Sequence, residues 1–160
     1  MTFKPIIATA AMLALPLLVG AATDNLVAYP DGYRHWTHVK SMVIHPEHGL
    51  ADPFEGIHHV YANADALAGL KSGQYVAGAT LVFDLLHQDS GDAAIQEGNR
   101  KFIGVMEYDE ERFADTGGWG FEAFAGDSKT ERVVKDGGAS CFACHQAVEK
   151  DKYVFSKYRN

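Results

Sequence analysis

Residues 79–86 read Ala-Thr-Leu-Val-Phe-Asp-Leu-Leu, and this nearly continuous apolar stretch decides the fold. Such a run, bounded by turn signals, is typical of a β-strand that is buried on both faces. Residues 57–61 (IHHVY) are rich in β-branched and aromatic side chains, and residues 119–124 (WGFEAF) alternate in a strand-like way. Residues 39–44 and 101–106 are two further strand candidates. The chain therefore contains enough strands for one sheet.

Helical signals between these strands are short. Asn63 is a good N-cap for a helix that continues through Leu70, and residues 33–36 predict a single helical turn. Residues 45–56 hold two prolines and two glycines and predict a loop, and the polar residues 87–98 predict a surface loop. We therefore expect an α+β domain, mainly an antiparallel β-sheet with short helices, and not a four-helix bundle.

The first 22 residues have the pattern of a secretory signal peptide. Lys4 precedes an apolar run over residues 6–19, and the small residues Gly20 and Ala22 follow it. A charged start, an apolar middle and a small-x-small end are the three parts of such a peptide. We expect cleavage after Ala22 and export across the inner membrane to the periplasm.

A retained membrane anchor is the alternative for this segment. The run is shorter than the roughly 20 apolar residues of a membrane span, and Pro16 interrupts it. Cleavage would leave residues 23–160 as a single domain, a size that can bury one ordinary core. The formal net charge of −7 argues against nucleic acid as a partner.

The two cysteines of the chain both lie in residues 141–145, which read CFACH. This C-x-x-C-H pattern is that of covalent haem attachment. Two thiols at this spacing can add to the two vinyl groups on one edge of a porphyrin, and the next residue then lies beneath the iron. We therefore predict one haem c per chain, attached through Cys141 and Cys144, with His145 as the proximal ligand of the iron.

Two other interpretations of the motif are a redox pair and half of a zinc site. A redox pair usually sits early in a thioredoxin-like unit, after a strand. A structural zinc site needs four ligands, and the chain has no second cysteine pair. Haem attachment agrees better with the predicted export, because c-type haem is assembled outside the cytoplasm.

The chemistry of the haem depends on the sixth iron ligand, which the motif does not fix. Electron carriers usually place Met or a second His there, whereas gas-binding haems leave the position open. No methionine follows His145. The upstream candidates are Met42, Met106, His35, His38, His45, His48, His58, His59 and His87. Most of these side chains are expected to be surface or packing residues.

The order and spacing of several motifs resemble the cytochrome P460 family, and most closely its cytochrome c′-beta branch. The resemblance covers nearly all of the chain after residue 22. The motifs that carry it are residues 32–36 (GYRHW), 58–63 (HHVYAN), 79–86 (ATLVFDLL), 117–121 (GGWGF) and 141–145 (CFACH).

The resemblance implies a mostly antiparallel β fold, a homodimer and a haem iron with one protein ligand and an open opposite face. In the hydroxylamine-oxidising members a lysine is cross-linked to the porphyrin, and the matching residue here is Phe83. Lys71 and Lys101 do not match that position. The c′-beta branch binds nitric oxide and carbon monoxide beneath two phenylalanines, whose matching positions are Phe54 and Phe83.

These features favour a periplasmic gas-binding protein that scavenges, senses or transports nitric oxide, and they give no indication of a catalytic residue. An apolar cap offers no donor for bound dioxygen and no base for hydroxylamine oxidation. His58 and His59 point to opposite sides of their strand, so one of them could approach the pocket or the haem edge. An enzyme of the cross-linked type and a periplasmic electron carrier with an unknown redox partner are the alternatives.

Overall fold

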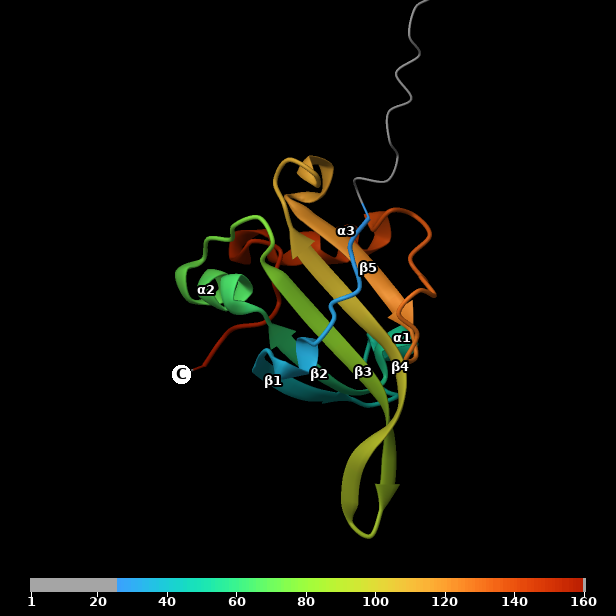
Figure 1. Cartoon of the computed structure of the whole chain (residues 1–160). Coiled ribbons are helices and arrows are strands. Elements are labelled where there is room, and N and C mark those ends of the chain that lie inside the picture. The colour runs from blue at the N-terminus through green and yellow to red at the C-terminus, as the bar shows by residue number, and fades with distance from the viewer. Residues whose placement is uncertain (1–25, 160) are drawn as a thin grey trace, which may run out of the picture.

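The computed structural model describes residues 26–159 as a five-stranded antiparallel sheet with a few short helices (Figure 1). The strands lie in the order β1-β2-β3-β4-β5, so each pairs with its neighbour in the sequence. Their bounds are β1 Thr37–Ile44, β2 Gly56–Ala62, β3 Thr80–Gly91, β4 Ala94–Tyr108 and β5 Trp119–Ala125. The α+β prediction is confirmed. The predicted signal peptide, residues 1–22, lies outside the described residues.

The helices are short, and they lie before, between and after the strands. Their bounds are η1 Tyr33–His35, α1 Ala51–Phe54, α2 Ala64–Ser72, η2 Ala114–Thr116, α3 Ala139–His145 and η3 Gln146–Asp151. The helix α2 begins as predicted, because the Asn63 side chain accepts a hydrogen bond from the Ala66 N–H at 2.8 Å. No helix in residues 26–159 is long and apolar enough to cross a membrane.

The strand β3 is central, and both of its faces are covered. On one face Leu81 packs with Phe121 of β5 and with residues of α3, and we call this the α3 face. On the other face Val82 packs with Tyr33 and other residues near the N-terminus, and we call this the N-terminal face. Figure 1 shows the blue N-terminal segment in front of the sheet and α3 behind it. Two-sided burial explains why residues 79–86 lack an apolar/polar alternation.

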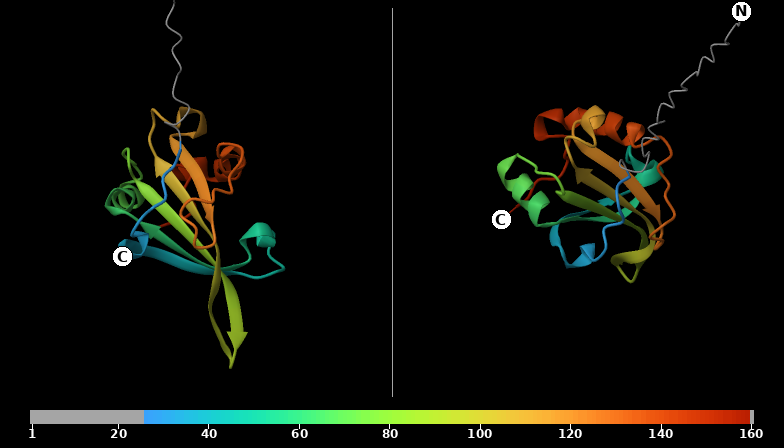
Figure 2. Two further views of the ribbon diagram at one scale, coloured as in Figure 1. Left: turned by 45° about the vertical axis from the view of Figure 1, so that its right-hand side comes forward. Right: turned by 45° about the horizontal axis from the view of Figure 1, so that its top comes forward.

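The prediction of a surface loop over residues 87–98 is wrong. β3 continues to Gly91 and β4 begins at Ala94, so the segment is a hairpin that projects from the sheet (Figures 1 and 2). Its turn residues Asp92 and Ala93 both have left-handed backbone angles, as a two-residue hairpin turn requires. Most of this ribbon is exposed on both faces. Its residues are therefore polar, and the hydrophobic pattern that marks a half-buried strand is absent.

Candidate haem site

The helix α3 carries the C-x-x-C-H motif and lies close against β5. Gly138 caps its start with a left-handed backbone, and a Cβ atom there would lie 2.9 Å from Cβ of Phe121. The Asp136 carboxylate accepts hydrogen bonds from the N–H groups of Gly138 and Ser140 at 3.1 and 2.9 Å. A small residue and a capping carboxylate thus fix where the helix begins relative to the sheet.

The two thiols of the motif are not joined to each other. Cys141 is half-buried, Cys144 is exposed, and both are free cysteines. Burial raises the pKa of the Cys141 thiol. Free thiols spaced one helical turn apart are what thioether formation with a porphyrin requires.

His145 ends α3, and two aromatic rings pack against its imidazole. The ring centroid lies 5.0 Å from that of Phe121 and 4.9 Å from that of Phe155. Its Nδ1 atom donates a hydrogen bond to the Tyr153 carbonyl oxygen at 2.6 Å. Burial lowers the pKa of His145, which favours the neutral imidazole. The hydrogen bond places the proton on Nδ1 and leaves the Nε2 lone pair for a metal ion.

An aromatic cluster lies on the α3 face at β3 and β4. Phe54, at the end of α1, meets Phe83 of β3 edge-on with ring centroids 5.9 Å apart. The structure therefore brings together two phenylalanines that are 29 positions apart in the sequence. Phe102 of β4 is a third member, with its centroid 6.0 Å from Phe54 and 6.1 Å from Phe83. The alternation of β4 could have placed Phe102 on this face, but the residue was not predicted.

Small residues leave the sheet open beside this cluster. Phe83 pairs with Gly104, and Gly104 pairs with Ala123, so a row across three strands carries one large side chain and two minimal ones. A Cβ atom built on Gly104 would lie 3.6 Å from Cβ of Phe83. A side chain on Gly104 would project from the α3 face beside the rings of Phe83 and Phe102, and its absence lets another group approach the backbone closely there.

The structure separates His58 from His59. His58 is 2% exposed on the α3 face, and its ring centroid lies 4.4 Å from that of Phe83. Its Nδ1 atom is buried without a hydrogen-bond partner. Burial, then the charge of Lys40 and that of His59, lowers its pKa to about 4, so His58 is neutral near pH 7.

His59 lies on the N-terminal face, away from the aromatic cluster. Its Nδ1 atom is 2.6 Å from Oγ of Ser41, and its Nε2 atom is 2.6 Å from Oε1 of Glu97. The hydroxyl of Ser41 also meets Nε2 of His38 at 2.9 Å. Of the two histidines, only His58 shares the face of Phe83.

The remaining candidates for a sixth iron ligand are dispersed. Met42 is 38% exposed on the edge strand β1, whereas Met106 packs in the core of the α3 face near Trp119. The other histidines are exposed, namely His35, His38, His45, His48 and His87. These five histidines do not belong to the aromatic cluster of Phe54, Phe83 and Phe102.

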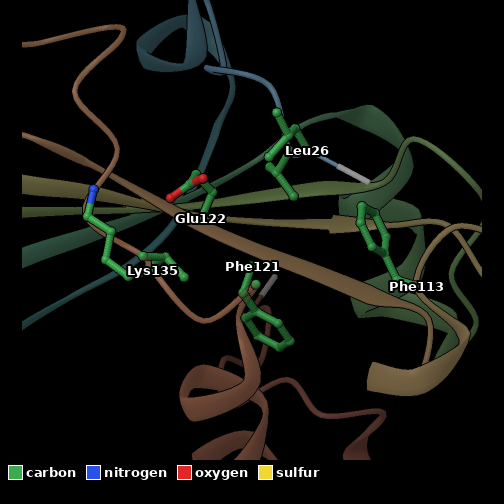
Figure 3. A pocket seen from close by; sticks show the side chains of 8 residues that line it. Leu26, Phe113, Phe121, Glu122 and Lys135 are labelled. Carbon is green, nitrogen blue, oxygen red and sulfur yellow. The ribbon is translucent and has the colours of Figure 1, made fainter. Parts of the chain in front are cut away.

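A separate cavity of about 220 Å³ lies beside β5. Figure 3 shows Phe121 and Glu122, which point to opposite sides of the strand, together with Leu26, Phe113 and Lys135. The motif cysteines and the three clustered phenylalanines do not line it. The cavity therefore shares Phe121 with the α3 face but not the phenylalanine cluster or the two thiols.

The residues on the α3 face fit a haem. They provide two free thiols, a histidine with an available Nε2 atom, and an open row of small residues beside an apolar cluster. The unpartnered Nδ1 atom of His58 offers a further polar contact. These features are those of a covalently held, partly enclosed prosthetic group.

The comparison with known protein families agrees with this geometry. The family model for cytochrome P460 matches residues 30–156, which include the sheet, α3 and the C-x-x-C-H motif. No curated relative matches the sequence. The chain belongs to the cytochrome P460 family of haem-binding cytochromes.

Proposed function

We propose that the protein is an exported c-type cytochrome whose single haem binds small gases, nitric oxide and carbon monoxide, at a five-coordinate iron. The haem is joined to Cys141 and Cys144, and His145 binds the iron through Nε2. The protein scavenges, senses or transports nitric oxide in the periplasm, after removal of residues 1–22, as a homodimer. When bound, the haem supplies an iron atom with an open position for a diatomic ligand.

One observation carries the proposal: Phe54 and Phe83 meet on the same face of the sheet as the haem motif. Phe83 stands where the resemblance places a cross-linking lysine in the hydroxylamine-oxidising relatives. Phe102 extends the apolar surface. Such a surface excludes water and admits small neutral molecules.

The polar groups near the cluster are few. The neutral imidazole of His58 is one of them, and it contacts the ring of Phe83. Lys101 donates a hydrogen bond from Nζ to the carbonyl oxygen of Glu55 at 2.8 Å. That lysine therefore holds the segment that carries Phe54. Lys71 instead lies over the ring of Tyr158, with Nζ 4.9 Å from the centroid.

The first experiment is the optical spectrum of the purified ferrous protein before and after the addition of carbon monoxide. A high-spin spectrum that shifts with the gas supports the five-coordinate iron. A low-spin spectrum that is indifferent to the gas indicates a sixth protein ligand and favours the electron carrier.

A proteolytic digest separates the gas-binding proposal from the enzyme alternative. We expect the haem to carry only the peptide with residues 141–145, through two thioether bonds. A second peptide on the porphyrin, containing a lysine, would instead indicate a cross-linked enzyme. Sedimentation velocity of the same sample tests the homodimer.

A further inference from the structure

The start of β5 lies within the motif over residues 117–121 (GGWGF). The tryptophan of this motif makes a hydrogen bond to a residue far along the chain. Trp119 is fully buried. Its Nε1–H group, the only hydrogen-bond donor of the side chain, donates to the Lys152 carbonyl oxygen at 2.9 Å. A buried indole N–H normally has such a partner, but here the partner belongs to the turn beside the haem motif.

That turn has an uncommon backbone. Lys152 and Tyr153 are consecutive non-glycine residues with left-handed φ angles of 57° and 63°. Such angles are unfavourable for residues with a side chain and persist only where the surroundings fix them. The conformation directs the Tyr153 carbonyl oxygen to Nδ1 of His145, at 2.6 Å. The Trp119 contact therefore lies one peptide unit away from the acceptor that His145 uses.

Gly117 contacts the same turn, because its backbone lies directly against the Tyr153 ring. A Cβ atom on Gly117 would lie 2.4 Å from Cε2 of that ring, and the glycine itself has a φ of 66°. The ring also packs against Phe142 of α3, with centroids 5.2 Å apart. The motif over residues 117–121 thus contacts both the peptide that joins Lys152 to Tyr153 and the ring of Tyr153.

We propose that Trp119 and Gly117 are positioning residues for the iron ligand, acting through the Lys152–Tyr153 turn on the hydrogen bond of His145. The inference rests on the proposed ligation of the iron by His145. A histidine whose Nδ1–H donates to a well-placed acceptor is a more basic ligand and stabilises the ferric over the ferrous iron. Loosening the turn weakens that hydrogen bond and raises the reduction potential.

The experiment is a potentiometric titration of the purified haem-loaded protein with Trp119→Phe. Phenylalanine keeps the aromatic packing but removes the N–H donor, so the Lys152 carbonyl loses its partner. We expect the ferric–ferrous equilibrium to move about tenfold towards the ferrous form, consistent with the effect of outer-shell partners. That change corresponds to a rise of about 59 mV for one electron. An unchanged potential in a folded, haem-loaded variant would overturn the inference.

A matched pair at Lys152 tests the turn itself without removing the tryptophan. Lys152→Gly and Lys152→Val lose the same charge, so their difference reports the backbone alone. Glycine adopts the left-handed angle freely, whereas a β-branched residue is strongly disfavoured there. We expect the Val variant to have the higher potential, in the direction of Trp119→Phe. Equal potentials for the pair would contradict the proposed role of the turn.

Tyr108→Leu is the control for packing. The Tyr108 ring contacts Trp119 at a centroid distance of 5.1 Å, but it takes no part in the hydrogen bonds of Lys152 and His145. We expect lower stability and an unchanged potential. A shift as large as that of Trp119→Phe would assign the effect to loosened packing and overturn the inference.

These outcomes remain separate from those of the proposed function. The potential can be measured whether or not a sixth ligand binds the iron, so a low-spin, gas-indifferent protein would refute gas binding and leave the titration readable. In ferrous high-spin samples, the iron–histidine stretching frequency should fall in Trp119→Phe and in Lys152→Val. A frequency that stays constant in both variants would count against the inference.

Discussion

At the scale of single residues, the proposed function predicts that Phe83 and Phe54 limit access of gases to the iron. Their rings meet edge-on 5.9 Å apart, so truncating either one opens the apolar cluster. We expect Phe83→Ala and Phe54→Ala to increase the carbon monoxide association rate about tenfold or more, and haem attachment to remain intact. Flash photolysis measures the rate, and Phe113→Leu, on the N-terminal face, is the control. Unchanged kinetics in both alanine variants would refute the cap assignment.

His58 makes stability depend on pH. Its folded-state pKa of about 4 lies below the ordinary value of 6.5, so between these values the unfolded chain binds more protons. The free energy of unfolding should therefore be highest above pH 6.5 and fall as the pH drops towards 4, by up to about 3 kcal/mol. Denaturant unfolding at pH 7 and pH 4.5 measures the loss. His58→Gln should lose clearly less over the same interval, and an identical loss would exclude His58 as the cause.

At the scale of elements, a buried carboxylate connects η1, β3 and β4. Asp84 is 0% exposed and accepts hydrogen bonds from Tyr33 at 2.7 Å, Arg34 at 3.0 Å and Arg100 at 2.6 Å. It follows Phe83 in the strand and points to the other face. These hydrogen bonds therefore fix the position of β3, the strand that carries Phe83.

Removing the charge of Asp84 leaves the guanidinium groups of Arg34 and Arg100 without their buried counterion. We expect Asp84→Asn to lower the free energy of unfolding by about 3 kcal/mol, because one partner of a buried pair is lost. Asp127 is a matched control, since it contacts the same Arg100 but its side chain is 81% exposed. Asp127→Asn should change stability little. Equal losses in denaturant unfolding would show that burial does not decide the effect.

At the scale of the whole molecule, the projecting β3–β4 hairpin is an appendage of the sheet. Its strands pair only with each other beyond Gln88 and Glu97, and most of its residues are exposed. Replacing residues 89–96 with Asn-Gly should change the free energy of unfolding by less than about 1 kcal/mol and leave haem attachment intact. Chemical denaturation measures the free energy of unfolding, and the haem content of the purified protein measures haem attachment. A failure to fold would show that the hairpin is needed for the sheet to form.

The local sequence patterns predicted the strands and helices well where one or both faces of the element are buried. The apolar residues 79–86 predicted the central strand, and Asn63 predicted the start of α2. The hairpin over residues 87–98 was missed, because a ribbon in water on both faces has no hydrophobic periodicity. The short helix α1 within residues 45–56 was missed as well, since a single turn rich in breakers resembles a loop.

The sequence by itself determined the family, the α+β class and the predicted haem motif, because these depend on residue types and spacings within short segments. Only the tertiary structure decided that His58 and not His59 lies beside Phe83, and that Phe102 joins the cluster. It alone placed the Tyr153 carbonyl against His145 and connected Trp119 to that turn. These contacts depend on strand register and on chain segments that meet only after folding, which local sequence does not encode.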